Sequence, residues 1–314
     1  MAGQCWLRPC LRLASLGLLL SPSSFTFNSP HIPTQISPAS YFQSQKIASA
    51  MANEIAQSCT TSDIEQYIAA FRDSWQQEGA VRQLVTNCGQ TATLTLTQVL
   101  QKEPDAGIRQ TAAFALRCLG GATATKALIS TLSTDPTSTV RQAVAEDLGY
   151  IRAASAINPL IVTLKKTNED PVVRQAAAKA LGNIGGTIAM DALVGTLKDI
   201  HESLNLRQSA VKALQQIGEP ATNALVMTLQ ASDLRTRYWA VAALSEIKSP
   251  RAIKALEENK VKVIQILEAA YEADIVEFDR APPGPTRRAI GNKLARKPIV
   301  CRIKWITQYW ARCG

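Results

Sequence analysis

The sequence predicts an all-α fold, a right-handed α-solenoid of about six helix pairs, over residues 51–280 of the 314-residue chain. Five segments repeat around an arginine at intervals of 30 to 33 residues, and apolar residues recur within each segment at the spacing of one helix face. Aromatic residues make up only 5 % of the chain, and small aliphatic side chains suit closely stacked helices. The chain is long enough to bury a sizeable core.

The first helix of each repeat is expected to begin near this arginine. In every copy Ala or Val follows the arginine by three residues, Leu by seven, and Leu or Ile by ten. With the residue before the arginine, these positions form one apolar helix face. A degenerate sixth copy begins at Val81. The five arginines are Arg109, Arg141, Arg174, Arg207 and Arg237.

A second helix is expected later in each repeat. A leucine lies 18 or 19 residues after each arginine, and in four copies another leucine follows four residues later. Gly120, Gly185 and Gly218 are placed to end the first helix, because glycine is favoured just after a helix C-terminus. In the fifth copy Lys260 replaces the later leucine, so we expect this terminal helix to face water. A lone pair cannot bury its apolar face, so neighbouring pairs must stack.

The residues before the first repeat predict an N-terminal cap. Ser62 and Glu65 form a capping-box pattern, which predicts that a helix of roughly sixteen residues begins there.

Residues 173–185 follow the pattern Val/Ile-Arg-x-x-Ala-Ala-x-x-Leu-Gly-x-Ile-Gly. This motif resembles the HEAT-like repeats of the phycobilisome-lyase type, and the resemblance covers about residues 80–270. The resemblance implies HEAT-like helix pairs in which the arginine pairs with an acid of the preceding turn. The acids in that position are Asp105, Asp135, Asp170 and Asp233. We therefore assign the five arginines to an internal structural ladder rather than to a ligand site.

The resemblance leaves two functions open. The first is a non-catalytic scaffold or adaptor that binds another protein on its concave face, and the second is a bilin lyase or phycobilisome-associated factor. The motif is structural, so no catalytic residue is carried over from it. The two histidines, His31 and His201, provide no triad or zinc site, and the single pair His201-Glu202 is too little for the iron site of the related deoxyhypusine hydroxylases. We expect no cofactor and no metal.

The two ends carry the excess positive charge of the chain. Residues 1–50 hold three basic residues and residues 280–314 hold nine, with no acidic residue in either segment. The remaining residues hold 22 basic and 25 acidic side chains. We therefore do not expect a basic groove that would bind nucleic acid.

The N-terminal fifty residues predict a leader and a linker. Residues 1–20, basic and then apolar, have the order of a secretory signal, and residues 21–50 are a Ser/Pro-rich linker expected to be disordered. A real signal implies export to the periplasm or the extracellular space. If translation instead starts at Met51, the protein is cytoplasmic.

Residues 281–314 form a Pro-rich break followed by a basic tail. Apolar residues at helical spacing predict a short amphipathic helix that contacts an anionic membrane surface or an acidic partner, or else packs against the solenoid end. The candidate contact residues are Arg302, Lys304, Trp305, Tyr309 and Trp310. A disulfide between Cys301 and Cys313 would exclude that helix, because twelve residues of straight helix span about 18 Å.

The other cysteines match no zinc or redox motif. Cys88 and Cys118 fall within helical patterns, so we expect both to be free and buried as small apolar side chains.

Overall fold

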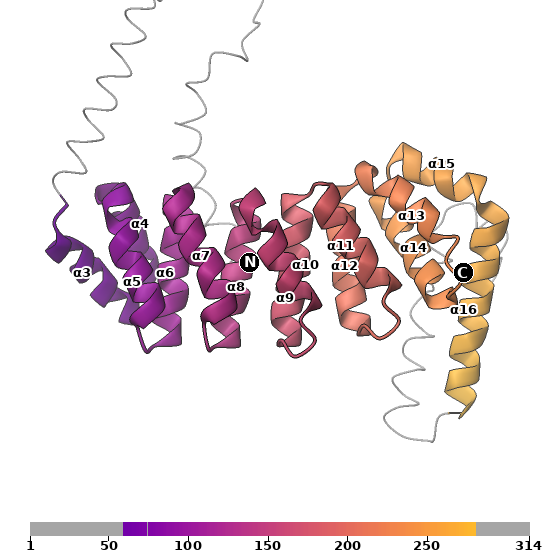
Figure 1. The fold of residues 1–314 in the computed structure, drawn as a ribbon, viewed down its shortest axis with the longest axis horizontal. Coiled ribbons are helices and arrows are strands. Elements are labelled where there is room, and N and C mark those ends of the chain that lie inside the picture. Colours follow the sequence, from indigo (N-terminus) through magenta and orange to yellow (C-terminus); the bar gives the residue numbers. More distant parts are fainter. Residues whose placement is uncertain (1–58, 74, 281–314) are drawn as a thin grey trace, which may run out of the picture. The chain divides into compact units, whose positions relative to one another are not determined.

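The computed structural model describes residues 59–73 and 75–280 of the chain (Figure 1). The predicted signal at 1–20, the linker at 21–50, the alternative start at Met51 and the tail at 281–314 lie outside the described residues. Over the described part the chain is helical without a strand, so the all-α prediction is confirmed. These helices form two compact units that divide inside one helix, between Val144 and Ala145.

Unit 1 begins with a short helix and continues with two helix pairs. Its elements are α3 (Thr61–Ala69), the 3₁₀ turn η1 (Ala70–Arg72), α4 (Gln77–Asn87), η2 (Gly89–Ala92), α5 (Thr93–Lys102), α6 (Ala106–Leu119), α7 (Gly121–Thr134) and the first half of α8 (Ser138–Tyr150). Helix α6 packs against α4, α5 and α7, which buries the apolar faces of both pairs.

Unit 2 continues the alternation of first and second helices. After the second half of α8 it holds η3 (Ala154–Ala156), α9 (Ile157–Lys165), α10 (Pro171–Ile184), α11 (Thr187–Lys198), α12 (Leu204–Ile217), η4 (Glu219–Ala221), α13 (Thr222–Thr228), α14 (Leu234–Ile247), α15 (Pro250–Glu258) and α16 (Lys260–Arg280). Helices α10, α12 and α14 pack side by side in one row, and α9, α11, α13 and α15 form the other row. The described elements thus give the six predicted helix pairs, from α4–α5 to α14–α15.

The leucine pattern defines the core of the repeats. The leucine seven residues after each arginine is fully buried in all five copies: Leu116, Leu148, Leu181, Leu214 and Leu244. The leucines of the second helices are buried as well, at Leu128, Leu160, Leu193, Leu225 and Leu256. By contrast, the residue ten after the arginine is only half-buried, because it lies at the open C-terminal end of the first helix.

The ends of the first helices follow capping chemistry. Gly120, Gly185 and Gly218 end α6, α10 and α12 with φ of 67°, 74° and 76°, in the left-handed region that glycine tolerates best. At the other end, Asp105 and Asp233 accept hydrogen bonds from the backbone N–H groups that begin α6 and α14.

Two further glycines let the first helices approach closely. A Cβ on Gly149 of α8 would lie 2.6 Å from the Cα of Ala180, and a Cβ on Gly182 of α10 would lie 2.7 Å from the Cα of Ala213. Both distances are too short for a side chain. The backbones of neighbouring first helices are therefore in contact at this position, eight residues after the arginine.

The N-terminal cap differs from its prediction. Thr60, not Ser62, is the N-cap: it donates from its backbone N–H to Asp63, whose own N–H donates to the Thr60 hydroxyl. Ser62 cannot cap because it already lies inside α3. The helix has nine residues instead of sixteen, because the chain tightens into η1 at Ala70, where Phe71 becomes fully buried.

The C-terminal end of the repeats also differs from its prediction. Helix α15 ends at Glu258, so Lys260 begins a new helix rather than continuing the second helix of the pair. Helix α16 packs on α14 and α15 and buries Val263, Ile266 and Leu267. The last repeat is thus covered by an additional helix, and the expectation that it faces water is wrong.

Candidate functional site

The arginine of the first full repeat is buried and fully bonded. Arg109 donates from Nε and Nη2 to the two carboxylate oxygens of Asp135, at 2.8 and 3.0 Å. Its Nη1 donates to the carbonyls of Glu103 and Pro104 at 2.8 and 2.9 Å, and Nη2 also donates to the hydroxyl of Thr137 at 3.0 Å. These contacts use all five N–H groups that a guanidinium offers.

The electrostatics of this pair are those of a structural contact. The hydrogen bonds to Asp135 raise the pKa of Arg109 above its ordinary value, although burial acts in the opposite direction. Asp135 accepts one further hydrogen bond, from the backbone N–H of Thr137 at 2.8 Å. No donor of Arg109 is left to hold a substrate or a cofactor.

The next arginines make related contacts. Arg174 donates from Nε to the carbonyl of Leu164 at 2.8 Å and forms an ion pair with Glu202. Arg141 donates from Nη1 to the backbone carbonyl of Asp135 at 2.7 Å. The acids of Arg109 and Arg174 thus come from later in the chain, 26 and 28 residues on.

The last two arginines lack an acid partner of that kind. Arg207 is buried and donates from Nη2 to the carbonyl of Asp199, but its Nε has no hydrogen-bond partner. Burial lowers its pKa, and repulsion from Arg235 adds to this effect against the attraction of Asp233. The Nε of Arg237 is likewise buried and without a partner. Asp233 caps α14 instead of pairing with Arg237, so the predicted pair is not formed.

The expected pairing with the acid of the preceding turn is therefore wrong for Arg109 and Arg174, whereas Arg141 does contact Asp135 of its preceding turn, through the backbone carbonyl. Asp105 and Asp170 lie directly before α6 and α10, and there their carboxylates bond to free backbone N–H groups. Arg109 and Arg174 instead reach acids in the turn that follows their own helix pair. Sequence spacing could not show this, because the acid comes within reach only once the helices pack.

Among the described residues no group of three or more His, Cys, Asp and Glu side chains could hold a metal ion. His201 is exposed in the turn before α12, where its backbone N–H donates to Asp199 at 2.9 Å. Glu202 pairs with Arg174. The tail residues Arg302, Lys304, Trp305, Tyr309 and Trp310 lie outside the part of the chain that the structure describes. No helix within that part is long and apolar enough to cross a bilayer.

Three second helices of unit 2 each expose a large apolar side chain that the repeat pattern did not predict as a binding site. Val162 on α9, Ile188 on α11 and Met227 on α13 have exposed fractions of 67, 58 and 71 %. Val162 and Met227 each follow the buried leucine of their helix by two residues, and Ile188 precedes its own by five. At 3.6 residues per turn, all three lie about 200–220° from those leucines, on the outward side. We call these three residues the outer row.

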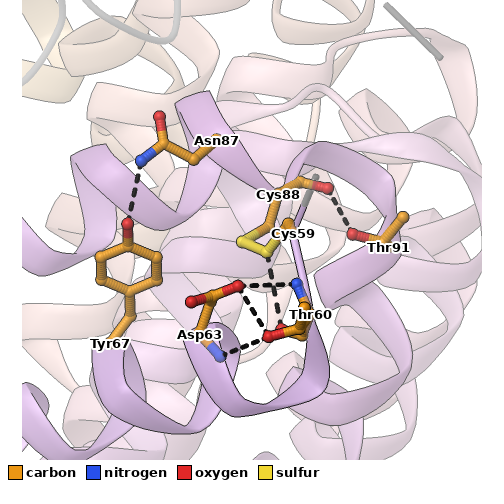
Figure 2. Close-up of a disulfide and its surroundings, with 7 residues drawn as sticks. All are labelled: Cys59, Thr60, Asp63, Tyr67, Asn87, Cys88 and Thr91. Atoms are coloured by element: carbon orange, nitrogen blue, oxygen red, sulfur yellow. Dashed lines mark hydrogen bonds between the residues drawn. A yellow bond between two sulfur atoms is a disulfide. The ribbon is translucent and has the colours of Figure 1, made fainter. Parts of the chain in front are cut away.

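A disulfide joins Cys59 to Cys88 in unit 1, with the two Cα atoms 5.1 Å apart (Figure 2). The prediction that Cys88 is a free thiol is therefore wrong, although it is fully buried as expected. Cys118 is also disulfide-bonded and only half-buried, so the prediction of a free and buried thiol is wrong at that position too. The pairing carries no sequence signal, because 29 residues separate the two cysteines and only the hairpin of α3 and α4 brings them together.

The stacked helix pairs define a helical repeat protein of the α-solenoid class. A family model of HEAT repeats matches residues 125–204 and 200–273. Residues 125–273 therefore contain HEAT repeats, as the motif at residues 173–185 indicated.

Solved structures of helical proteins are also similar to the chain. A complex of CpcE and CpcF of phycocyanin lyase from Nostoc sp. PCC7120 is 26 % identical, with 87 % of this chain and 98 % of that chain covered and a TM-score of 0.38. Human deoxyhypusine hydroxylase in complex with glycerol is 20 % identical, with 60 % and 98 % covered and a TM-score of 0.30. An engineered protein is 22 % identical, with 68 % and 97 % covered and a TM-score of 0.35. No curated protein matches the sequence.

Proposed function

We propose that this protein is a non-catalytic scaffold that binds another protein through the outer row of its second helices. The observation that carries the proposal is that three neighbouring second helices of one unit each expose a large apolar side chain, at Val162, Ile188 and Met227. Single exposed apolar residues are common on soluble proteins, whereas exposed apolar side chains on several neighbouring elements are typical of interaction surfaces.

The flanks of the outer row are polar, as in most protein interfaces. Asp191 of α11 and Asn223 of α13 are exposed near the apolar side chains, and Arg251 of α15 donates to Asn223 Oδ1 at 3.0 Å. An apolar centre with a polar rim fits a protein partner that presents an apolar ridge of its own. The buried arginines contribute by fixing the turns between the helices.

The test uses the full chain and a triple variant, Val162→Asp, Ile188→Asp and Met227→Asp. Proteins that co-purify with the wild type, but not with the variant, are identified by mass spectrometry, and the partner is then purified and titrated by calorimetry. We expect the variant to weaken binding by about a hundredfold or more, because each aspartate must lose its hydration at the interface. The matched control is Leu94→Asp with Val261→Asp, which changes exposed apolar residues outside the outer row. Equal affinity of the wild type and the triple variant would contradict the proposal.

The second candidate is a bilin lyase, which the motif at residues 173–185 favours because that repeat type includes such enzymes. Mixing the full chain with a linear tetrapyrrole and recording visible absorbance separates the two functions. An absorbance shift, or transfer of the pigment to an antenna subunit, would replace the scaffold with the lyase. Unchanged spectra would leave the binding role.

We further propose that the basic tail at residues 281–314 adds an anionic contact to this scaffold. The tail holds eight basic residues and no acidic one, which supports attraction to a membrane surface of anionic lipids. The chain should co-sediment with vesicles that contain phosphatidylserine, less so in high salt, and the variant that ends at residue 280 should not. Equal sedimentation of the two chains would contradict the tail's role.

Export is the compartment that we propose. The Cys59–Cys88 disulfide supports it, because structural disulfides persist mainly in oxidising compartments. Determining the N-terminus of the protein from its native source tests this directly. An N-terminus at Met1 or Met51 would favour the cytoplasm, whereas a processed N-terminus after the apolar run at Leu13–Leu20 is the expected result.

A further inference from the structure

The disulfide of unit 1 ties the first described helix to the first helix pair. Cys59 directly precedes Thr60, the N-cap of α3, and Cys88 is the C-cap of α4 (Figure 2). The bond therefore joins the start of one helix to the end of the next. Its Cα separation of 5.1 Å lies within the range that an unforced disulfide requires.

Apart from this bond, α3 is held by α4, and η1 is held by α4, by α6 and by an exposed ion pair between Arg72 and Glu103. Ile64 and Phe71 are buried, and two side chains reach across from α4: Asn87 donates to the hydroxyl of Tyr67 at 2.9 Å, and Gln77 donates to the carbonyl of Phe71 at 2.7 Å. A helix of nine residues is not stable alone in water, because its nucleation costs more than so few hydrogen bonds return.

Helix α4, by contrast, is part of the repeat core. It buries Val81, Leu84 and Val85 and packs against α6. Cys88 is fully buried, whereas Cys59 is half-buried. The two ends of the bond thus differ: one belongs to a firmly held helix and the other to a weakly held one.

We propose that the Cys59–Cys88 disulfide is a redox-sensitive clasp, which holds α3 and η1 on unit 1 when oxidised and releases them when a dithiol reduces it. The thiolate of the dithiol attacks the more accessible sulfur, that of Cys59, and the Cys88 thiolate leaves. The second thiol of the reductant then displaces Cys59 from the mixed disulfide. Two electrons pass from the dithiol, which becomes a cyclic disulfide, and both cysteines end as thiols with the two protons.

Release changes what unit 1 exposes at this end. The apolar surface of α4 that α3 covers becomes accessible, while α4 itself stays folded because its core contacts with α6 do not involve α3. The clasp is therefore a local device, and its opening is distinguishable from unfolding of the unit.

Hydrogen exchange read by mass spectrometry tests the clasp on the full chain. It compares the oxidised protein, the protein in dithiothreitol, and the double variant Cys59→Ser with Cys88→Ser, which isolates this bond from the other five cysteines. We expect amides of residues 61–72 to exchange roughly tenfold faster or more in the reduced protein and in the variant, with α6 and α12 unchanged. The matched control is Cys118→Ser, which removes the separate disulfide of Cys118 and should leave residues 61–72 protected in the oxidised state.

Three results would overturn the proposal. Equal exchange at residues 61–72 with and without the bond would show that other contacts hold α3. Loss of protection throughout α4–α7 in the double variant would show that the disulfide stabilises the fold of the whole unit and not only the position of α3. A peptide map of the unreduced protein without the Cys59–Cys88 pair would remove the clasp altogether.

Discussion

At the scale of single residues, Arg109 shows why this repeat position takes arginine. Its two-point contact with Asp135 and its bonds to two carbonyls and a hydroxyl require a planar group with five donors. Lysine has three donors on one atom and could not make this set of contacts. Burial makes each partner necessary, since a lost partner leaves an unpaired charge away from water.

The first prediction concerns this pair. Replacing Asp135 with alanine should lower the free energy of unfolding by about 3–5 kcal/mol, because it leaves the guanidinium of Arg109 buried without its counter-charge. The matched control, Glu78→Ala, breaks the exposed pair with Arg82 and should cost about 0–1 kcal/mol. Urea unfolding followed by circular dichroism measures both. Similar losses of unfolding free energy in the two variants would show that the buried pair contributes no more to stability than the exposed pair.

The second prediction concerns the two kinds of helical glycine. Gly182→Ala should destabilise by about 1–3 kcal/mol, because the new Cβ forces α10 and α12 apart at Ala213. Gly195→Ala, in an exposed position of α11 with open space around it, should stabilise by about 0.5–1 kcal/mol. Thermal or urea midpoints give the signs. Stability changes of the same sign in the two variants would contradict the close approach of α10 and α12 at Gly182.

At the scale of helices, the acids before the first helices act as caps. Burial alone would raise the pKa of Asp233, but hydrogen bonds donated by the backbone and side chain of Thr236 outweigh it and lower the pKa below its ordinary value of 3.8. The charged carboxylate is thus the form that the fold favours. It is also well placed at the positive end of the α14 dipole.

The third prediction follows from this shift. Because the pKa of Asp233 is lower in the folded state, its stabilising contribution is present above 3.8 and is lost as pH falls through the folded-state pKa. Asp233→Asn keeps the capping ability but not the charge. The wild type should therefore be the more stable at pH 7, and the difference should shrink below pH 4. A constant difference in urea midpoints from pH 7 to pH 3 would exclude this linkage.

The helices themselves were largely predictable, because they depend on local periodicity. The leucines seven residues after each arginine, and the glycines at 120, 185 and 218, take the places that the repeat assigned to them. The partners of the arginines were not predictable in this way. Asp105 and Asp135 have the same local context, a turn before a helix, and only stacking decides which of them Arg109 reaches.

The candidate surface had a weaker signal than the core. Val162 and Met227 each follow a core leucine by two residues. The spacing that predicted the buried face of each helix therefore also predicted that these two residues lie on the opposite, exposed face. The disulfide had no sequence signal, and the motif contained Gly182 without indicating its contact with Ala213. Both depend on distances between segments that are far apart in sequence.

At the scale of the whole molecule, stacked helix pairs are stabilised mainly by contacts between neighbouring pairs. The fourth prediction is that damage stays local. In Asp135→Ala, amides of α6 and α7 should lose protection from hydrogen exchange, whereas those of α12 and α14 in unit 2 should keep it. Exchange measured peptide by peptide decides this. Uniform loss of protection in both units would indicate a single cooperative structure.

Arg109 contacts an acid that follows its own helix pair. This arrangement determines where the chain could be cut to insert or exchange repeats. The hydrogen-bond acceptors of Arg109 lie between Glu103 and Thr137. This segment begins just before the helix pair of Arg109 and ends just after it. A splice after Thr137 would transplant this segment with its internal charges matched. A splice at Gly120, between the two helices, would separate Arg109 from Asp135. Each would then be buried without its charge partner.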